Sequence, residues 1–464
     1  MIAMKRVRKL SRADLEYLES VLGKEWISRG TSTRELHSHD ESFHTPCLPD
    51  VVVWPHSTDE VSSIVRFAAE KDLPVTAWGA GSSLEGNPIP VEGGIVLDLE
   101  EMNKVLAIRH EDFQVDVQAG VIYKELNEKL RHYGLFFPPD PGAAATVGGM
   151  IANNASGIRT VKYGATKDNI LRLVVVLPDG DVIEVGTRAR KSSSGYDLVH
   201  LFIGSEGTLG VVTEATLKLS GLPVNFMAVR ATFPTVKDAT NTVFQIMSSG
   251  LIPGAMEFLD AETVKAINRD RQLSLEELPT LLMEFNGFSE RGLEEELAFV
   301  EDICRENDYT FLDKGLGAEE RNRLWEIRHH TFESIKRNHP DLLPMIIDVA
   351  VPLSRYSEAV TFTKDVIGDL TAYVFGHAGD GNIHVTIMDR PDDAERWKIV
   401  EEANNRIVMK AIEYEGTCSG EHGVGIGKRK FMEAEHGRSL SMMRRIKTEL
   451  LDPRGIMNPG KKLP

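Results

Sequence analysis

The chain has 464 residues and a mass of 51.5 kDa, about three times the usual domain length of roughly 150 residues. Hydrophobic residues make up 42% and charged residues 27% of it, values that exclude a largely disordered or fibrous protein. The net charge of -17 has the wrong sign for a protein that neutralises phosphates, so no nucleic-acid partner is expected. The cysteines Cys47, Cys304 and Cys418 form neither a disulfide framework nor a CxxC pair, which predicts a reducing, intracellular compartment.

The beginning of the chain is basic, but Ser11, Arg12 and Asp14 follow where a signal peptide would need apolar residues. We therefore expect no secretion signal and a cytoplasmic location. The longest uncharged stretch, 141–158, is rich in Gly, Asn and Ala, which predicts a packed loop and no transmembrane segment. Peripheral contact with a membrane stays open, because a surface patch leaves no hydropathy signal.

The first predicted element is an amphipathic helix in an N-terminal segment, 1–45. Leucines at positions 10, 15, 18 and 22 share one face, with Ser11 as N-cap and Gly23 as the stop. From 46 to 222, short β-branched runs alternate with Gly, Pro and Asn turns and a few helices, which predicts a glycine-rich α+β domain. Its predicted strands are 51–54, 74–77, 94–97, 171–177 and 210–217.

The sequence pattern changes over 223–417, where predicted strands alternate with longer helices. This pattern predicts an antiparallel sheet covered on one side by helices. The predicted strands include 226–232, 255–259, 281–285 and 346–351. One predicted helix begins after Thr235 and stops at Gly250. Further predicted helices cover 290–306, 318–336, 357–369 and 393–415. The tail, 418–464, is again rich in glycine and is predicted to pack on the domain 46–222.

Glycine-rich loops are the first candidate binding elements. The run 74–88 is a strand followed by a turn with Gly79, Gly81 and Gly86, whose backbone N–H groups could face one anion. The glycine spacing and the Gly-Asn-Pro stop fit neither a Rossmann motif nor a P-loop, and a simple tight hairpin is an equal alternative.

Two further loops strengthen the case for a ligand. The residues of 138–157 are nearly all small, as expected where backbone approaches a flat ring or a pyrophosphate, although close helix packing would also explain them. The segment 204–213 adds glycines just before a strand. Three such loops in one domain predict a large, extended ligand.

Histidines and a carboxylate form the second candidate site. His377 and His384 lie seven residues apart across a glycine-containing turn, which excludes a helical HExxH motif and indicates a hairpin or loop. Glu421 and His422 are adjacent in another glycine-rich segment. Two imidazoles and one carboxylate could hold Zn²⁺, Mn²⁺ or Fe²⁺, but sequence distance does not show that the three meet.

From 39–42 and 49–55 to 457–461, the chain resembles the flavoprotein family that shares the FAD domain of vanillyl-alcohol oxidase, the PCMH type. Within it, the resemblance is closest to the FAD-linked D-2-hydroxyacid dehydrogenases of the cytochrome-type D-lactate dehydrogenase group. It implies a two-part FAD-binding domain, a substrate (cap) domain with an antiparallel sheet covered by helices, and a tail that returns to the FAD domain. The residues it implies for FAD binding are Trp78, Gly79, Ala80, Gly81, Ser82, Ser83, Pro141, Gly142, Ala143, Thr146, Gly148, Gly149, Asn153, Ser156, Gly157, Glu206, Gly207, Val212 and Asn458.

The resemblance also assigns roles in the oxidation of a 2-hydroxy acid. It implies a divalent metal on His377, His384 and Glu421, with His422 beside the substrate as the proton acceptor. The arginine of Leu324-Trp-Glu-Ile-Arg328 would hold the substrate carboxylate, the alternative being an ordinary surface arginine.

Departures from the family pattern refine these expectations. The first glycine loop contains no histidine for a covalent flavin bond, so noncovalent FAD is expected. Trp78 stands where many relatives have an arginine. Ile346 and Thr386 replace the lysine and asparagine of 2-hydroxyglutarate enzymes, which favours small monocarboxylates such as D-lactate, glycolate or D-2-hydroxybutyrate.

Several alternatives stay open at this stage. The electron acceptor could be a cytochrome, a quinone or an electron-transfer flavoprotein, and a homodimer is compatible with the sequence. The competing functions are the flavin subunit of a glycolate oxidase complex, a D-2-hydroxyglutarate dehydrogenase, an alkyl-glycerone-phosphate synthase-like transferase and a flavin-binding sensor without turnover.

Overall fold

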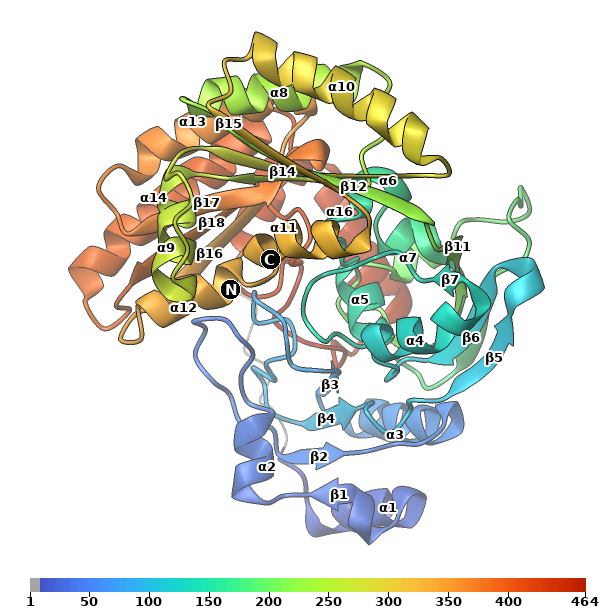
Figure 1. Ribbon diagram of the computed structural model, residues 1–464. Helices are drawn as coiled ribbons and strands as arrows, with labels where there is room; N and C mark the ends of the chain where they lie inside the picture. Colours follow the sequence, from blue (N-terminus) through green and yellow to red (C-terminus); the bar gives the residue numbers. More distant parts are fainter. Residues whose placement is uncertain (1–8) are drawn as a thin grey trace. The chain divides into compact units, whose positions relative to one another are not determined.

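The computed structural model describes residues 9–464, except for the side chain of His329. The basic start of the predicted N-terminal segment, residues 1–8, lies outside this range. The chain forms two compact units (Figure 1). Unit 1 consists of Met1–Ser156, Gly164–Leu222 and Glu421–Pro464, and unit 2 of Gly157–Tyr163 and Pro223–Gly420.

Unit 1 begins with the predicted amphipathic helix, which the structure confirms as α1 (Arg12–Leu22). Ser11 is its N-cap and accepts a hydrogen bond from the backbone of Asp14, and Gly23 is its C-cap. Leu18 and Leu22 are buried against the first sheet and its helix, so the leucine face predicted from the sequence is the packed face.

The first sheet of unit 1 has the order β1-β2-β4-β3. Strands β2 (Val51–Val53), β4 (Ile95–Asp98) and β3 (Val75–Trp78) are parallel, and helix α3 (Thr58–Lys71) connects β2 to β3. β1 (Ile27–Ser28) adds an antiparallel edge. Continuous burial along β2 and β4 is the pattern expected of a parallel sheet.

The second sheet of unit 1 is antiparallel, with the order β5-β6-β10-β8-β9. Its strands are β5 (Val105–Arg109), β6 (Gln114–Gln118), β10 (Val211–Lys218), β8 (Ile170–Val176) and β9 (Val182–Gly186). Helices α4 (Tyr123–Leu130), α5 (Val147–Asn153) and α7 (Val199–Phe202) pack in the same hydrophobic core. A short antiparallel pair, β7 (Leu135–Phe136) and β11 (Ser220–Gly221), completes the unit's strands.

From Glu421 onward, the C-terminal tail belongs to unit 1. It forms helices that the sequence did not predict, α15 (Met432–His436), α16 (Ser439–Arg445) and the π-helical turn η8 (Ile446–Leu451). Met457 then pairs in parallel with Val75 of β3, and the backbone N–H of Asn458 donates to the carbonyl of Val75 over 2.8 Å. The tail thereby extends the first sheet beside β3.

Unit 2 is built on a seven-stranded sheet in which every strand pairing is antiparallel, as predicted. Its order is β15 (Phe311–Leu316), β12 (Asn225–Thr232), β14 (Thr280–Gly287), β13 (Ala255–Leu259), β17 (Ala372–His377), β18 (Asn382–Asp389) and β16 (Leu343–Ala350).

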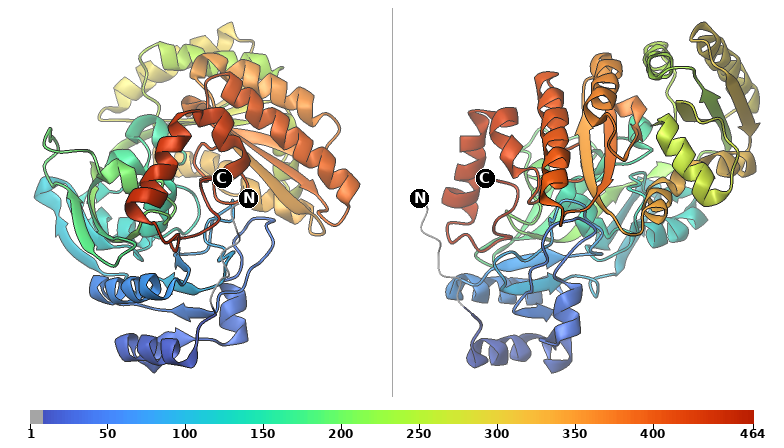
Figure 2. Two further views of the ribbon diagram at one scale, coloured as in Figure 1. Left: turned by 180° about the vertical axis from the view of Figure 1, so that it is seen from behind. Right: turned by 90° about the vertical axis from the view of Figure 1, so that its left-hand side faces the viewer.

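Helices lie on both faces of this sheet, so the prediction of a single covered face was wrong (Figures 1 and 2). One face carries α9 (Ala261–Arg271), α11 (Ala318–His329) and α12 (Thr331–Asn338), whose Ile267, Ile327 and Ile335 pack with Leu282 of β14. The other face carries α8 (Val236–Ser248), α10 (Glu290–Glu306), α13 (Tyr356–Ile367) and α14 (Ala394–Glu413). All five residues of β13 are buried, as a sheet covered on both faces requires.

Two features of these helices bear on the sequence predictions. The single helix predicted over 318–336 is two helices, because the chain leaves the helical conformation at His330 (φ -110°, ψ 13°). The longest helix of residues 9–464 is α14, with 20 residues. No helix in that range is both long and apolar enough to cross a membrane.

Candidate functional site

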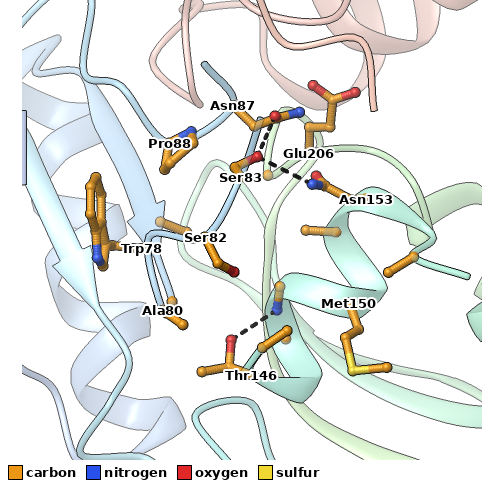
Figure 3. Close-up of a pocket in the computed structure, with 18 of the residues that line it drawn as sticks. Trp78, Ala80, Ser82, Ser83, Asn87, Pro88, Thr146, Met150, Asn153 and Glu206 are labelled. Carbon is orange, nitrogen blue, oxygen red and sulfur yellow. Dashed lines mark hydrogen bonds between the residues drawn. The ribbon is translucent and has the colours of Figure 1, made fainter. Parts of the chain in front are cut away.

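Unit 1 contains a cleft with about 1320 Å³ of empty space, including its open mouth. Its walls come from the turn after β3, the segment around α5, the turn before β10 and three residues of the tail, Glu421, His422 and Asn458. Figure 3 shows how residues of these segments surround the space. The three glycine-rich loops thus meet at one cleft, as a large, extended ligand requires.

Of the 19 residues predicted to bind FAD, 17 line this cleft. Gly142 and Gly157 do not line it, and Gly157 belongs to unit 2. Other wall residues were not predicted, among them Leu84, Asn87, Pro88, Ala119, Met150 and Phe202. Leu84, Asn87, Pro88 and Met150 lie inside the predicted loops but were not singled out, whereas Ala119 and Phe202 lie outside the loop motifs.

The first glycine loop requires glycine for steric reasons. A Cβ atom at Gly79 would lie 2.4 Å from Oγ1 of Thr146, and one at Gly81 would lie 2.9 Å from the Trp78 ring. Gly81 also has a φ of +67°, in the left-handed region that favours glycine. The loop therefore lies directly against the start of α5.

The second loop leads into α5 and serves packing as well as the cleft. Thr146 is the N-cap of α5, and its Oγ1 accepts a hydrogen bond from the Gly149 N–H over 3.2 Å. The Gly148 N–H donates to the Ala119 carbonyl over 2.7 Å, and a Cβ at Gly148 would lie 2.8 Å from the Ala119 Cβ. The packing explanation for small residues thus holds at Gly148.

Two buried asparagines in the cleft wall carry polar atoms without a hydrogen-bond partner in residues 9–464. These atoms are Nδ2 of Asn87 and Oδ1 of Asn458, on residues that are only 5% and 4% exposed. The opposite atoms are engaged: Oδ1 of Asn87 accepts from Ser83 over 2.5 Å (Figure 3), and Nδ2 of Asn458 donates to the Glu206 carbonyl over 2.7 Å. Unpaired buried amide atoms indicate a polar ligand, because leaving them unpaired is costly.

The charge of the wall restricts how such a ligand can be held. Within the described chain, no lysine or arginine lines the cleft. A diphosphate there would depend on backbone N–H groups of the glycine loops. A wall of small residues with unpaired amide donor and acceptor atoms fits FAD, which combines a planar ring system, amide-like ring edges and a diphosphate.

Glu206 holds the loop that follows the predicted base, His422, through hydrogen bonds. Its two carboxylate oxygens accept hydrogen bonds from the backbone N–H groups of Val424 and Gly425, each over 2.8 Å. The Glu206 side chain is fully buried, and Nζ of Lys462 lies 3.3 Å from Oε1. Glu206 was predicted to bind the cofactor, but its carboxylate acts on the loop that follows His422.

Glu421 and His422 also contact residues of the segment around α5. Oγ of Ser156 donates to Oε2 of Glu421 over 2.7 Å, and Nδ2 of Asn153 donates to the His422 carbonyl over 3.4 Å. Nε2 of His422 lies 3.7 Å from Oε1 of Glu421. The predicted base and the predicted carboxylate ligand therefore stand together at the wall of the cleft.

In unit 2, His377 is the last residue of β17, and His384 is the third residue of β18, the strand that follows it. The predicted glycine-containing turn is confirmed as a short 3₁₀ turn closed by Gly381, whose φ is +70°. The two imidazole rings are 5.1 Å apart and perpendicular to each other, and both side chains are 6% exposed. Two buried imidazoles at this distance can coordinate one metal ion.

A carboxylate that the sequence analysis missed lies between His377 and Arg328. Glu257 of β13 is fully buried, and it accepts hydrogen bonds from Nδ1 of His377 and from Nε of Arg328, each over 2.5 Å. Burial alone would raise the pKa of Glu257, but the neighbouring His377 and Arg328 hold this pKa below its ordinary value. Glu257 therefore stays ionised between two predicted site residues.

Asp348 of β16 and Asn382 of β18 form a second buried polar pair beside His384. Nδ2 of Asn382 donates to Oδ1 of Asp348 over 2.7 Å, and the same oxygen lies 3.6 Å from Nδ1 of His384. The Asp348 side chain is fully buried. A charged residue inside an otherwise apolar strand was the sequence signal for both Asp348 and Glu257, because such residues are seldom buried without a partner.

The predicted catalytic and metal-binding residues fall into two sets. His377, His384 and Arg328 belong to unit 2, where Glu257 joins His377 to Arg328. Glu421 and His422 belong to unit 1 and line its cleft. A metal site shared by His377, His384 and Glu421 stays a prediction.

Two families match most of the chain. The family described as FAD binding domain matches residues 49–186, and the family described as FAD linked oxidases, C-terminal domain, matches residues 222–462. The fold, the cleft and these matches together define an FAD-linked oxidoreductase. The chain belongs to the family of FAD-linked oxidases.

Curated relatives cover nearly the whole chain. It is 43% identical to D-lactate dehydrogenase [cytochrome], mitochondrial, of Arabidopsis thaliana, over 91% of this chain and 75% of that protein. It is 36% identical to D-lactate dehydrogenase of Archaeoglobus fulgidus, over 89% of this chain and 90% of that protein. Glycolate oxidase subunit GlcD of Bacillus subtilis is also 36% identical, over 96% of both chains.

Solved structures share the fold at lower identity. Alkyldihydroxyacetonephosphate synthase superposes with a TM-score of 0.76 at 21% identity, covering 99% of this chain and 87% of that one. The 4-ethylphenol oxidase of Gulosibacter chungangensis gives a TM-score of 0.77 at 17% identity, covering 96% of both chains. These similarities confirm the predicted PCMH-type, α+β architecture.

Proposed function

We propose that the protein oxidises a small D-2-hydroxy acid, with D-lactate favoured, to the 2-oxo acid. The observation that carries this proposal is that His422 lines the same cleft as 17 of the residues predicted to bind FAD. A base at that wall can act on a substrate that lies beside the cofactor. The relatives named D-lactate dehydrogenase, at 36% and 43% identity, support the choice of substrate.

FAD is proposed to bind noncovalently in the cleft of unit 1. When bound, it supplies the acceptor for the hydride that leaves the α-carbon of the hydroxy acid. The glycine loops would hold the diphosphate through backbone N–H groups, and the free amide atoms of Asn87 and Asn458 would pair with polar groups of the cofactor.

His422 is the proposed proton acceptor. A neutral imidazole is a common acceptor for a proton that leaves a substrate hydroxyl. Asn153 donates a hydrogen bond to the His422 carbonyl, and the Glu206 carboxylate accepts hydrogen bonds from the N–H groups of Val424 and Gly425. These contacts keep His422 at the wall of the cleft. The proton and the hydride together account for the two electrons and two hydrogens that the alcohol loses.

A divalent metal on His377, His384 and Glu421 is the second part of the proposal. When bound, it supplies a Lewis acid that lowers the pKa of the substrate hydroxyl. Two imidazoles and a carboxylate suit Zn²⁺, Mn²⁺ or Fe²⁺. The hydrogen bond from Nδ1 of His377 to Glu257 leaves Nε2 as the donor atom for an ion, the usual arrangement of a metal-binding histidine.

Arg328 is proposed to bind the substrate carboxylate. Its Nε is held by Glu257, and its guanidinium lies 5.2 Å above the Phe375 ring, so its plane is fixed. A fixed, planar guanidinium suits a carboxylate better than a mobile ammonium group does. Ile346 and Thr386 are both buried and uncharged, which supports a substrate with one carboxylate.

The electron acceptor proposed first is a cytochrome, because the Arabidopsis relative carries that word in its name. A quinone or an electron-transfer flavoprotein are the alternatives. The same relative is named as mitochondrial, so the predicted cytoplasmic location gains no support from it. The homodimer stays a prediction.

Anaerobic reduction of the bound flavin tests the proposal. D-lactate should bleach the flavin band at about 450 nm, and L-lactate and D-2-hydroxyglutarate should not. His422→Ala should abolish bleaching while keeping bound FAD, whereas His200→Ala, which removes an exposed histidine paired with Asp197, should not change it. A spectrum that D-lactate leaves unchanged in the wild-type protein would refute the proposed activity.

The second candidate is a flavin subunit of a glycolate oxidase complex, which the Bacillus subtilis relative favours. In that case glycolate should bleach the flavin faster than D-lactate does, and turnover should need partner subunits. Reduction of an artificial acceptor by the purified chain with D-lactate would count against this candidate.

A further inference from the structure

Glu257 is a fully buried carboxylate that contacts two predicted site residues of unit 2. Its side chain has no exposed surface, and its two oxygens are divided between two partners. Oε1 accepts from Nδ1 of His377 and Oε2 accepts from Nε of Arg328, each over 2.5 Å. His377 ends β17, and Arg328 lies on α11, so Glu257 connects residues from two different elements.

We propose that Glu257 is a positioning residue that serves two sites at once. It keeps a proton on Nδ1 of His377, which leaves Nε2 to a metal ion, and it fixes the guanidinium of Arg328 for the substrate carboxylate. This inference rests on the proposed function, because it takes His377 as a metal ligand and Arg328 as the carboxylate-binding residue.

The geometry favours a positioning role over a purely structural one. A structural ion pair needs one cation for each buried carboxylate, but Glu257 gives one oxygen to each of two partners. Carboxylates that accept the second N–H of a metal-binding histidine fix its tautomer and its ring orientation. Sharing one carboxylate makes the orientation of the histidine depend on that of the arginine.

Unit 2 contains a natural control for this pair. On the neighbouring strand β14, Oε2 of Glu284 accepts from Nε of Arg321 over 2.6 Å, and the Glu284 side chain is 4% exposed. Arg321 is 15% exposed and Arg328 13%, so the two ion pairs are buried alike. The other oxygen of Glu284 accepts from Asn286 and not from an imidazole.

Glu257→Gln separates the two explanations. Glutamine keeps the shape but has only one acceptor oxygen, so its NH₂ group must face either His377 or Arg328 and lose that hydrogen bond. We expect the affinity for Zn²⁺ to fall about 10- to 100-fold and the KM for D-lactate to rise. Glu284→Gln removes an equally buried ion pair and should change neither quantity.

The experiment measures Zn²⁺ affinity by competition with a chelating dye on the FAD-loaded protein, together with kcat and KM. The inference is overturned if Glu257→Gln binds Zn²⁺ within about twofold of wild type, or if Glu284→Gln weakens binding equally. It is supported if only Glu257→Gln weakens it. If wild type binds Zn²⁺ no better than His377→Gln does, the metal part of the proposed function fails, and the inference fails with it.

A measurement on the wild-type protein covers the case in which Glu257→Gln does not fold. The ¹⁵N resonances of labelled histidines distinguish the two neutral tautomers, and His377→Gln identifies the His377 signal. The inference requires the proton on Nδ1. A proton on Nε2 of His377 in the metal-free protein would overturn it without affecting the proposed oxidation of D-lactate.

Discussion

Replacing Gly79 by alanine is the most direct test of the cleft in unit 1. The new Cβ would lie 2.4 Å from Oγ1 of Thr146, far inside an ordinary contact of about 3.5–4.0 Å. Either the Thr146 hydroxyl turns away and α5 loses its N-cap, a cost of about 0.5–2 kcal/mol, or the glycine loop shifts, a cost of about 1–3 kcal/mol.

Both responses disturb the wall where FAD is proposed to bind. A loss of about 1–3 kcal/mol in the bound state corresponds to FAD binding that is about 5- to 150-fold weaker, since about 1.4 kcal/mol is a factor of ten. The assay is titration of the apoprotein with FAD, followed by flavin fluorescence. Gly221→Ala is the matched control, because it lies in the same unit with no atom within 4 Å of the new Cβ.

A double variant distinguishes the steric contact from a general loss of stability. In Gly79→Ala/Thr146→Ala the offending hydroxyl is absent, and the Thr146 Cβ lies 3.6 Å from the added methyl group. The effect of Gly79→Ala should therefore nearly vanish when it is measured against Thr146→Ala alone, as in a double-mutant cycle. Unchanged FAD affinity in Gly79→Ala, or an equal loss in both backgrounds, would refute this reasoning.

Two other predictions concern the tail of unit 1. Glu206→Gln leaves one of the two loop N–H groups without its charged acceptor, at a cost of about 1.5–3 kcal/mol. The measured kcat should therefore fall while the FAD content stays the same. A loss of FAD with unchanged kcat per flavin would assign Glu206 to cofactor binding instead. Burial lowers the pKa of Lys461 to about 8, from an ordinary value of 10.5, so the unfolded chain binds more protons between these pH values. The free energy of unfolding should therefore rise with pH across that window, by up to about 3 kcal/mol, and urea denaturation of Lys461→Met should lack this slope.

The elements that the sequence predicted well are those with local signals. Helix α1 follows from the leucine spacing and from its caps Ser11 and Gly23, and α10 has the predicted bounds Glu290–Glu306. The strand β13 also has its predicted bounds, Ala255–Leu259. In each case the information lies within a few residues of the element, where periodicity and capping act.

The break at His330 shows where local signals failed. Both α11 and α12 consist of residues that tolerate helix, and no proline or glycine separates them. The break places Ile327 and Ile335 in the same core cluster as Leu282 of β14. Tertiary packing therefore overrides a helix propensity that would have joined the two segments.

The site residues also fall into those with a local sequence signal and those that only the tertiary structure reveals. The glycine loops were predictable because close backbone approach leaves a mark in the local composition, and 17 of 19 predicted residues line the cleft. Asn87 was noticed only as a residue that ends a turn, because its unpaired amide is revealed by burial and not by spacing.

Glu257 was overlooked for a related reason, although its sequence carries a usable signal. Strand β13 reads Ala-Met-Glu-Phe-Leu, and a carboxylate in the middle of a fully buried strand must find partners within the protein. The sequence could therefore have shown that Glu257 has a cationic or hydrogen-bonding partner. It could not have named His377, 120 residues away, because that pairing depends on the register of β13 with β17, where Glu257 stands opposite His377. The register of those two strands places the buried Glu257 carboxylate beside His377, where it can orient a histidine that is proposed to bind metal.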